Sequence, residues 1–167
     1  MKKLVVAAFA VAFAVVANAS AVLWMQIDPT VNGSDGNLVA DGLTAYLINA
    51  SYADTSFASA WASGGIDAAL TAAGDNVVDR LGYTVEGMVV ADEAASYGTA
   101  AINAYYVIVG DDEIFISGTQ AAVVDTLDTS NSTIEFTSDS STVVDAGSYA
   151  GGAAWVQNVP EPTSGLL

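Results

Sequence analysis

The chain has 167 residues, of which 53% are hydrophobic, 19 are acidic and 3 are basic, and its formal net charge is −16. It has no cysteine and no histidine, which excludes disulfide bridges, ordinary zinc sites and catalysis by Ser-His-Asp or Cys-His arrangements. An excess of acidic charge repels phosphate backbones, so nucleic acid is excluded as a partner.

The N-terminal segment has the three parts of a secretory signal. Lys2 and Lys3 precede an unbroken apolar run from Leu4 to Val16, and small residues follow the run. The run is shorter than the roughly 20 residues that a membrane-spanning helix needs. Residues 1–19 are therefore predicted to be a cleaved signal peptide rather than a permanent anchor.

The cleavage site is predicted from the spacing of small residues. Ala17 and Ala19 fit the two small-residue subsites of a signal peptidase, and cleavage there leaves Ser20 first. Ala19 and Ala21 fit nearly as well. The mature chain is therefore expected to start at Ser20 or at Val22.

Removal of the signal peptide leaves Arg80 as the only basic residue against 19 acidic ones, a formal net charge of −18. The absence of lysine then also excludes Schiff-base chemistry and Ser-Lys dyads. The acidic residues are numerous enough to include a catalytic pair of carboxylates of the glycosidase kind, but the sequence singles out no such pair. Because so few catalytic groups are left, the body is expected not to be an enzyme. About 148 residues suit one globular domain, predicted over residues 20–156.

In chain order, the first half predicts strands and then a helical region. Alternating or continuous apolar residues favour strands at Val22 to Ile27 and Leu43 to Ala50. The period becomes helical between Thr55 and Ala73. Gly64 and Gly65 interrupt that region, so two short helices are favoured over one long helix.

The second half predicts β-structure. Strands are expected at Thr84 to Val90, at Ile102 to Val109 and Glu113 to Ser117 as a hairpin, at residues 133–137 with one wet face, and at Gly152 to Val156. The fold class is therefore predicted as mainly β or α+β. The architecture expected is an antiparallel sheet or small sandwich with one or two short helices around residues 55–73.

No cofactor is expected, and the acidic loops suggest bound calcium as the alternative. Calcium takes oxygen ligands and needs neither His nor Cys. Asp and Gly also make ordinary turns, which is the simpler interpretation. None of the loops has the EF-hand spacing. The three candidate loops contain Asp28, Asn32 and Asp35; Asp111, Asp112 and Glu113; and Asp125, Asp128 and Asn131.

Aromatic residues suggest a carbohydrate-binding alternative, because flat apolar rings stack on sugars. The candidates are Trp24, Trp61, Trp155, Tyr97 and Tyr149. Trp24 and Trp61 lie in strand and helix patterns that would point them inward, and large aromatic side chains dominate cores.

A separate prediction concerns Arg80, the single basic residue after the predicted signal peptide. Arg80 is expected to pair with a nearby acid such as Asp79 or Asp75, or to clamp an anionic group bidentately.

The C-terminal residues Val159 to Leu167 read VPEPTSGLL, which resembles the start of a PEP-CTERM sorting signal. The residues that carry the resemblance are Pro160, Glu161 and Pro162. Two prolines hold such a segment extended, which is the form that a protease binds. Residues 157–167 are therefore interpreted as a linker and the beginning of the sorting signal.

The resemblance implies recognition and cleavage by an exosortase, a membrane-embedded enzyme. In that family an apolar helix and an Arg-rich tail follow the motif, so we expect this sequence to be C-terminally truncated and the gene to continue after Leu167. The implied partners are signal peptidase, exosortase and, by family association, exopolysaccharide. Contact with the membrane would be transient, through the missing helix.

The expected function is thus that of an exported bacterial protein at the cell surface or in the extracellular matrix, with a structural or adhesive body. The alternatives are a carbohydrate- or calcium-binding module and a carboxylate-based hydrolase.

Overall fold

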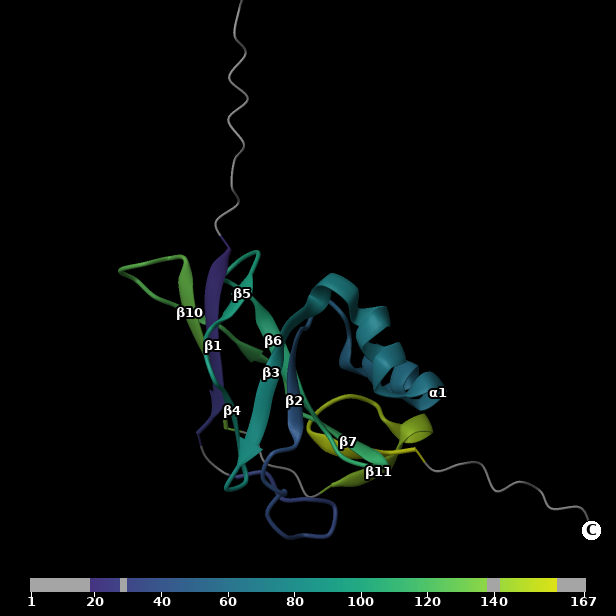
Figure 1. Ribbon diagram of the computed structural model, residues 1–167. Helices are drawn as coiled ribbons and strands as arrows, with labels where there is room; N and C mark the ends of the chain where they lie inside the picture. Colours follow the sequence, from purple (N-terminus) through teal and green to yellow (C-terminus); the bar gives the residue numbers. More distant parts are fainter. Residues whose placement is uncertain (1–18, 28–29, 138–141, 159–167) are drawn as a thin grey trace, which may run out of the picture.

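The computed structural model describes residues 19–27, 30–137 and 142–158, which form a curled β-sheet with one helix packed against it (Figure 1). The predicted mainly-β class is confirmed. The strands are β1 (Ser20–Gln26), β2 (Thr44–Asn49), β3 (Val77–Val85), β4 (Met88–Ala91), β5 (Ala95–Tyr97), β6 (Asn103–Val109), β7 (Glu113–Ile116), β8 (Gln120–Ala121), β9 (Val123–Val124), β10 (Asn131–Phe136), β11 (Val143–Asp145) and β12 (Ala154–Gln157).

The helix α1 (Asp54–Ala73) is broken where the two glycines stand. Gly64 and Gly65 have non-helical backbone angles. The φ of Gly65 is +72°, a value that residues other than glycine rarely adopt. The prediction of two helical segments is confirmed. Phe57 of the first segment and Leu70 of the second are buried against the sheet. A 3-10 turn, Gly74–Asn76, then leads into β3.

The strand order along the sheet is β11-β12-β7-β6-β2-β3-β4-β1-β10-β9. Most neighbours are antiparallel, as predicted, and the β6–β7 hairpin is confirmed. Two pairs, β1–β10 and β11–β12, are parallel, so the sheet is mixed. The β1–β10 pair joins segments that are far apart in the chain, because β1 begins at Ser20 and β10 at Asn131.

A short segment makes the sheet curl back on itself. Within residues 120–124, β8 pairs with β6, and β9 pairs with β10. β6 and β10 stand far apart in the strand order, yet this segment links them. The curl produces a concave side that is filled by aromatic and aliphatic side chains, among them Trp24, Tyr106 and Phe136.

The outer side of the sheet is covered in part by α1, as Figure 1 shows. β6 is buried on both faces, as its continuous apolar run predicts. Tyr106 points into the concave side, where its ring lies 4.8 Å from that of Phe136, edge to face. Tyr105 points the other way, and its ring meets Phe57 of α1 at 6.3 Å.

One predicted strand is wrong. Residues 84–90 do not form a single strand, because the chain reverses at Glu86 and Gly87 between β3 and β4. Both residues have positive φ, 49° and 77°, as a tight hairpin turn requires. Glutamate seldom adopts positive φ, so the sequence carried no strong turn signal there.

Among the described residues, no helix has the length and apolar character needed to cross a membrane.

Candidate functional site

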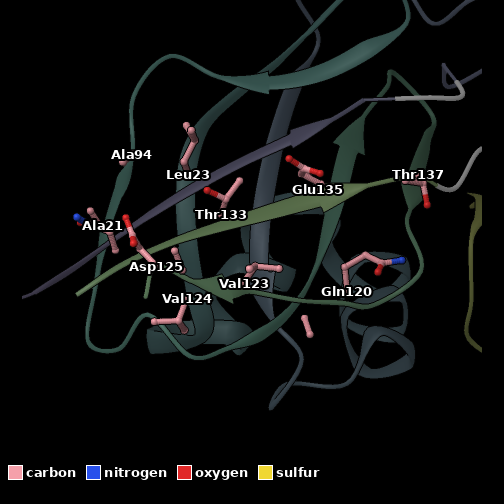
Figure 2. Close-up of a pocket in the computed structure, with 13 residues that line it drawn as sticks. Ala21, Leu23, Ala94, Gln120, Val123, Val124, Asp125, Thr133, Glu135 and Thr137 are labelled. Atoms are coloured by element: carbon pink, nitrogen blue, oxygen red, sulfur yellow. The ribbon is translucent and has the colours of Figure 1, made fainter. Parts of the chain in front are cut away.

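The candidate site is a hollow of about 760 Å³ on the outer side of β1 and β10 (Figure 2). The β8–β9 segment forms a second wall, and Ala94 stands at the rim. The lining residues come from distant parts of the chain: Ala21, Leu23, Ala94, Gln120, Ala121, Val123, Val124, Asp125, Asn131, Ser132, Thr133, Glu135 and Thr137.

The parallel β1–β10 pair positions the floor of the hollow. In its register Leu23 lies beside Thr133, and Met25 lies beside Glu135. Alternate residues of a strand face opposite sides, so the buried Ile134 points into the core while Thr133 and Glu135 point outward. Figure 2 shows Leu23, Thr133 and Glu135 projecting from the same side of the two strands.

The lining combines apolar contact area with oxygen and amide groups. Leu23 and Val123 provide apolar surface, Thr133 offers a hydroxyl, Gln120 an amide, and Glu135 an exposed carboxylate. Among the described residues no basic side chain lines the hollow, since Arg80, the one basic residue there, is exposed on β3. Such a site can accept hydrogen bonds from a neutral hydroxylated ligand or attract a cationic one, and it disfavours anions.

The loop beside the hollow contains the third predicted calcium cluster. Asp128 Oδ1 accepts hydrogen bonds from the Ser130 hydroxyl at 2.6 Å and the Ser130 amide at 3.1 Å, and its Oδ2 accepts one from Asn131 at 2.9 Å. The bonds from Ser130 hold the pKa of Asp128 below its usual value. Asp125 Oδ1 accepts the Leu127 amide at 2.7 Å. These carboxylates therefore brace their own loop.

In the other two predicted loops Asp35 also braces its own loop, whereas Glu113 ties distant segments together. Asp35 accepts both the side-chain and backbone N–H groups of Asn37, at 2.8 and 3.0 Å, and these bonds lower its pKa. Glu113 accepts hydrogen bonds from Ser34 at 2.7 Å and Gln157 at 3.1 Å. Asp28 lies outside the described residues. Over the described ranges, no three carboxylates come together as a metal site.

The three tryptophans are buried and cannot present a flat face to a sugar. Trp24, Trp61 and Trp155 are 0%, 7% and 1% exposed. The burial expected for Trp24 and Trp61 is confirmed. Trp155 donates its indole N–H to the Asn32 carbonyl at 2.6 Å, which fixes the loop after β1 against β12.

The two tyrosine candidates have structural partners. Tyr149 donates its hydroxyl to Asp54 Oδ2 at 2.9 Å, and the Gly152 amide donates to the same oxygen at 3.2 Å. Burial and the adjacent Asp54 carboxylate raise the pKa of Tyr149. Tyr97 donates to the Asp75 carbonyl at 3.2 Å and accepts from Asn49 at 3.1 Å.

The expected pairing of Arg80 with Asp79 is wrong. The two residues are neighbours on β3 at an irregularity in its pairing with β2, where the strand passes from buried to exposed residues. Asp79 is buried and accepts the indole N–H of Trp24, whereas Arg80 is exposed.

Of the predicted processing residues, the structure describes two. Ala19 is exposed and precedes β1, and Ser20 is the first, buried residue of that strand. Ala17 and the sorting motif Pro160, Glu161 and Pro162 lie outside the described residues.

The hollow was not predicted from the sequence. The alternation at residues 133–137 indicated one wet face, which is the only signal that pointed towards Thr133 and Glu135. Nothing local indicated that β1 would pair with β10, because that contact joins residues far apart in the chain.

Comparisons with known proteins give no relative on which to base a function. No protein-family model matches the chain, no curated protein is significantly similar to it, and no solved structure matches its fold.

Proposed function

We propose that this chain is an exported bacterial protein that an exosortase sorts to the cell surface or extracellular matrix, and that its body is structural or adhesive. The observation that carries the proposal is the position of the folded body between two sequence signals. The first strand begins at Ser20, directly after the secretory-type segment, and the last ends at Gln157, shortly before Pro160 to Pro162.

The composition of the folded body is consistent with a location outside the cytoplasm. Its stability comes from a core of interlocking aromatic and aliphatic side chains rather than from disulfides, since the chain has no cysteine. The net charge of −18 after removal of residues 1–19 favours solubility and disfavours nonspecific adhesion to other acidic surfaces. The absence of His, Cys and Lys from residues 20–167 favours a noncatalytic role.

Export is tested by disrupting the apolar run of the leader in the producing bacterium. Val11→Asp places a charge in that run, and Val11→Leu is the matched control. Cell fractions are probed with an antibody raised against the folded body. We expect the native and Val11→Leu chains outside the cytoplasm and the Val11→Asp chain inside. Cytoplasmic location of all three would refute the proposal.

The hollow supports a second candidate function, binding of a neutral or cationic oligosaccharide. Its mixture of apolar surface with hydroxyl, amide and carboxylate groups is typical of a site that binds hydroxylated ligands. The buried tryptophans leave this hollow, rather than an aromatic platform, as the place where a sugar would bind.

Oligosaccharide binding is tested by calorimetry with neutral and amino-sugar oligosaccharides. Thr133→Val removes one hydroxyl at nearly constant shape, and Glu135→Gln removes one charge. Asp67→Asn on the exposed side of α1 is the control for the charge change. Each change in the hollow should weaken binding by about tenfold, while the control should not. No heat of binding by the native chain would eliminate this candidate.

A further inference from the structure

The first strand of the fold starts directly after the predicted leader and has partners on both sides from its first residues. Ser20 pairs with Tyr97 of β5, and Ala21 pairs with Ser96 of β5. On the other side Ala21 lies beside Asn131 of β10. β1 is therefore an interior strand at its N-terminal end rather than a free edge.

The first two residues of β1 belong to the sheet as fully as those that follow. The Ala21 amide donates a hydrogen bond to the Ser130 carbonyl at 2.9 Å, and Ser20 is 9% exposed. Val22 is 0% exposed, with Ala95 and Ser132 as its strand partners. The preceding residue, Ala19, is exposed. The change from exposed to buried thus falls between Ala19 and Ser20.

The two junctions that the small-residue spacing allows have different consequences for this strand. A chain that starts at Val22 places a charged ammonium group where Val22 is buried between β5 and β10, and burial of an unpaired charge is costly. It also removes the hydrogen bond that the Ala21 amide donates to the Ser130 carbonyl, which anchors the start of β1 to the turn before β10. A chain that starts at Ser20 retains every β1 pair and places its ammonium at the edge of the sheet, next to the position of the exposed Ala19.

We propose that signal peptidase hydrolyses the Ala19–Ser20 bond and that Ser20 is the N-terminus of the folded protein. The inference rests on the proposed export. The oxygen of a water molecule bonds to the carbonyl carbon of Ala19, and the bond from that carbon to the Ser20 nitrogen breaks. The products are a carboxylate on Ala19 and an ammonium group on Ser20.

The fold then protects the alternative bond between Ala21 and Val22. A protease binds its substrate as an extended segment whose backbone hydrogen bonds are free. At Ala21 and Val22 the backbone is already paired with β5 on one side and β10 on the other. Once β1 has docked, the Ala21–Val22 bond lies inside the sheet, whereas the Ala19–Ser20 bond has only its second residue in β1. The start of the strand and the start of the mature chain therefore coincide.

The first test is the intact mass and N-terminal sequence of the protein exported by its producing bacterium. We expect a single N-terminus at Ser20. An N-terminus at Val22 would overturn this inference and leave the export proposal standing. An exported protein that still begins at Met1 would likewise overturn only this inference. A protein found only in the cytoplasm would overturn the export proposal itself, so the two failures are distinguishable.

The second test measures the thermal stability of chains with defined starts, released from a fusion partner that leaves no extra residue. We expect the chain from Ser20 to melt at least about 5 °C above the chain from Val22. The matched control starts at position 20 with Ser20→Gly and Ala21→Gly, which restores the backbone pairs without side chains. It should recover most of the difference. Equal melting temperatures for the chains from Ser20 and Val22 would overturn the structural basis of the inference.

Discussion

The indole nitrogen of Trp24 lies 2.5 Å from Oδ2 of Asp79, and this hydrogen bond joins the first strand to the third inside the curled sheet. Asp79 is 7% exposed, and its other oxygen accepts the Leu81 amide at 2.9 Å. A buried carboxylate needs such donors because it has lost contact with water. The pair therefore determines how β1 sits against β3.

Replacement of Trp24 by phenylalanine removes the donor and leaves a small void. We expect the free energy of unfolding to fall by about 3 kcal/mol, measured by urea denaturation. Trp61→Phe is the comparison, because Trp61 is also buried but its indole makes no hydrogen bond within the described residues. If the two variants lose equal stability, the Trp24–Asp79 hydrogen bond contributes nothing specific.

Gly82 of β3 is needed because the Trp24 ring lies directly against it. A methyl group at this position would overlap the indole ring and would come within 2.9 Å of the Ala45 carbonyl oxygen. Gly82→Ala should therefore cost about 3 kcal/mol, because neither the ring nor the backbone of β2 has room to move. Gly98→Ala is the control, since a methyl group there meets nothing within 4 Å. Equal melting curves for both variants would contradict the packing described.

The adjacent tyrosines of β6 should respond in opposite ways to loss of their hydroxyl groups. Tyr106 donates to Gln26 at 2.6 Å in the interior, so Tyr106→Phe should destabilise the fold by about 1–2 kcal/mol. The Tyr105 hydroxyl is buried and has no hydrogen-bond partner in the part of the chain that the structure describes. Tyr105→Phe should be neutral or stabilise by about 1 kcal/mol. A large loss of stability in Tyr105→Phe would show that this hydroxyl has a partner, such as a bound water molecule.

Alkaline pH should destabilise the protein through Tyr105 and Tyr149. Burial raises the pKa of both hydroxyls, and the neighbouring Asp54 carboxylate adds to the effect. A raised pKa in the folded state means that the unfolded chain releases these protons first. The stabilisation is therefore complete below about pH 10 and is lost progressively as the pH rises above it.

Urea midpoints between pH 7 and pH 11 measure this effect. The midpoint of the native chain should fall above about pH 10. Tyr149→Phe should start lower at pH 7, because it loses the Asp54 hydrogen bond, and should fall less steeply above pH 10. Tyr83→Phe removes a half-buried tyrosine whose pKa is raised by its hydrogen bond to Asp92, so it should also reduce the slope, but less than Tyr149→Phe does. A flat midpoint through pH 11 in the native chain would contradict the prediction.

Local sequence patterns predicted the elements whose structure depends mainly on residues that are close together in the chain. The apolar run at residues 102–109 and the turn after it identified the β6–β7 hairpin, and Gly64 with Gly65 identified the break in α1. The turn at Glu86 and Gly87 was missed because its geometry depends on the strands that it connects. A glutamate gave no indication of positive φ.

Contacts between distant segments were beyond the reach of such patterns. The parallel pairing of β1 with β10 and the link from β8 through β9 depend on how the whole sheet curls. The hollow exists only because of those contacts, so the alternation that placed Glu135 on a wet face could not reveal its neighbours. Conversely, carboxylates in the loops that suggested calcium accept hydrogen bonds from their own loop, as Asp128 shows, or from distant segments, as Glu113 shows.

The central claim, sorting by an exosortase, is tested most directly in the native gene of the producing bacterium. Pro160, Glu161 and Pro162 are replaced by alanine, with Thr163→Ala and Ser164→Ala together as the matched control, and the protein is followed in membrane and extracellular fractions with and without the exosortase gene. We predict that the native and control chains leave the membrane only when the exosortase is present, and that the triple variant stays in the membrane fraction. Release of the triple variant at the native level, or release that is independent of the exosortase, would contradict the account.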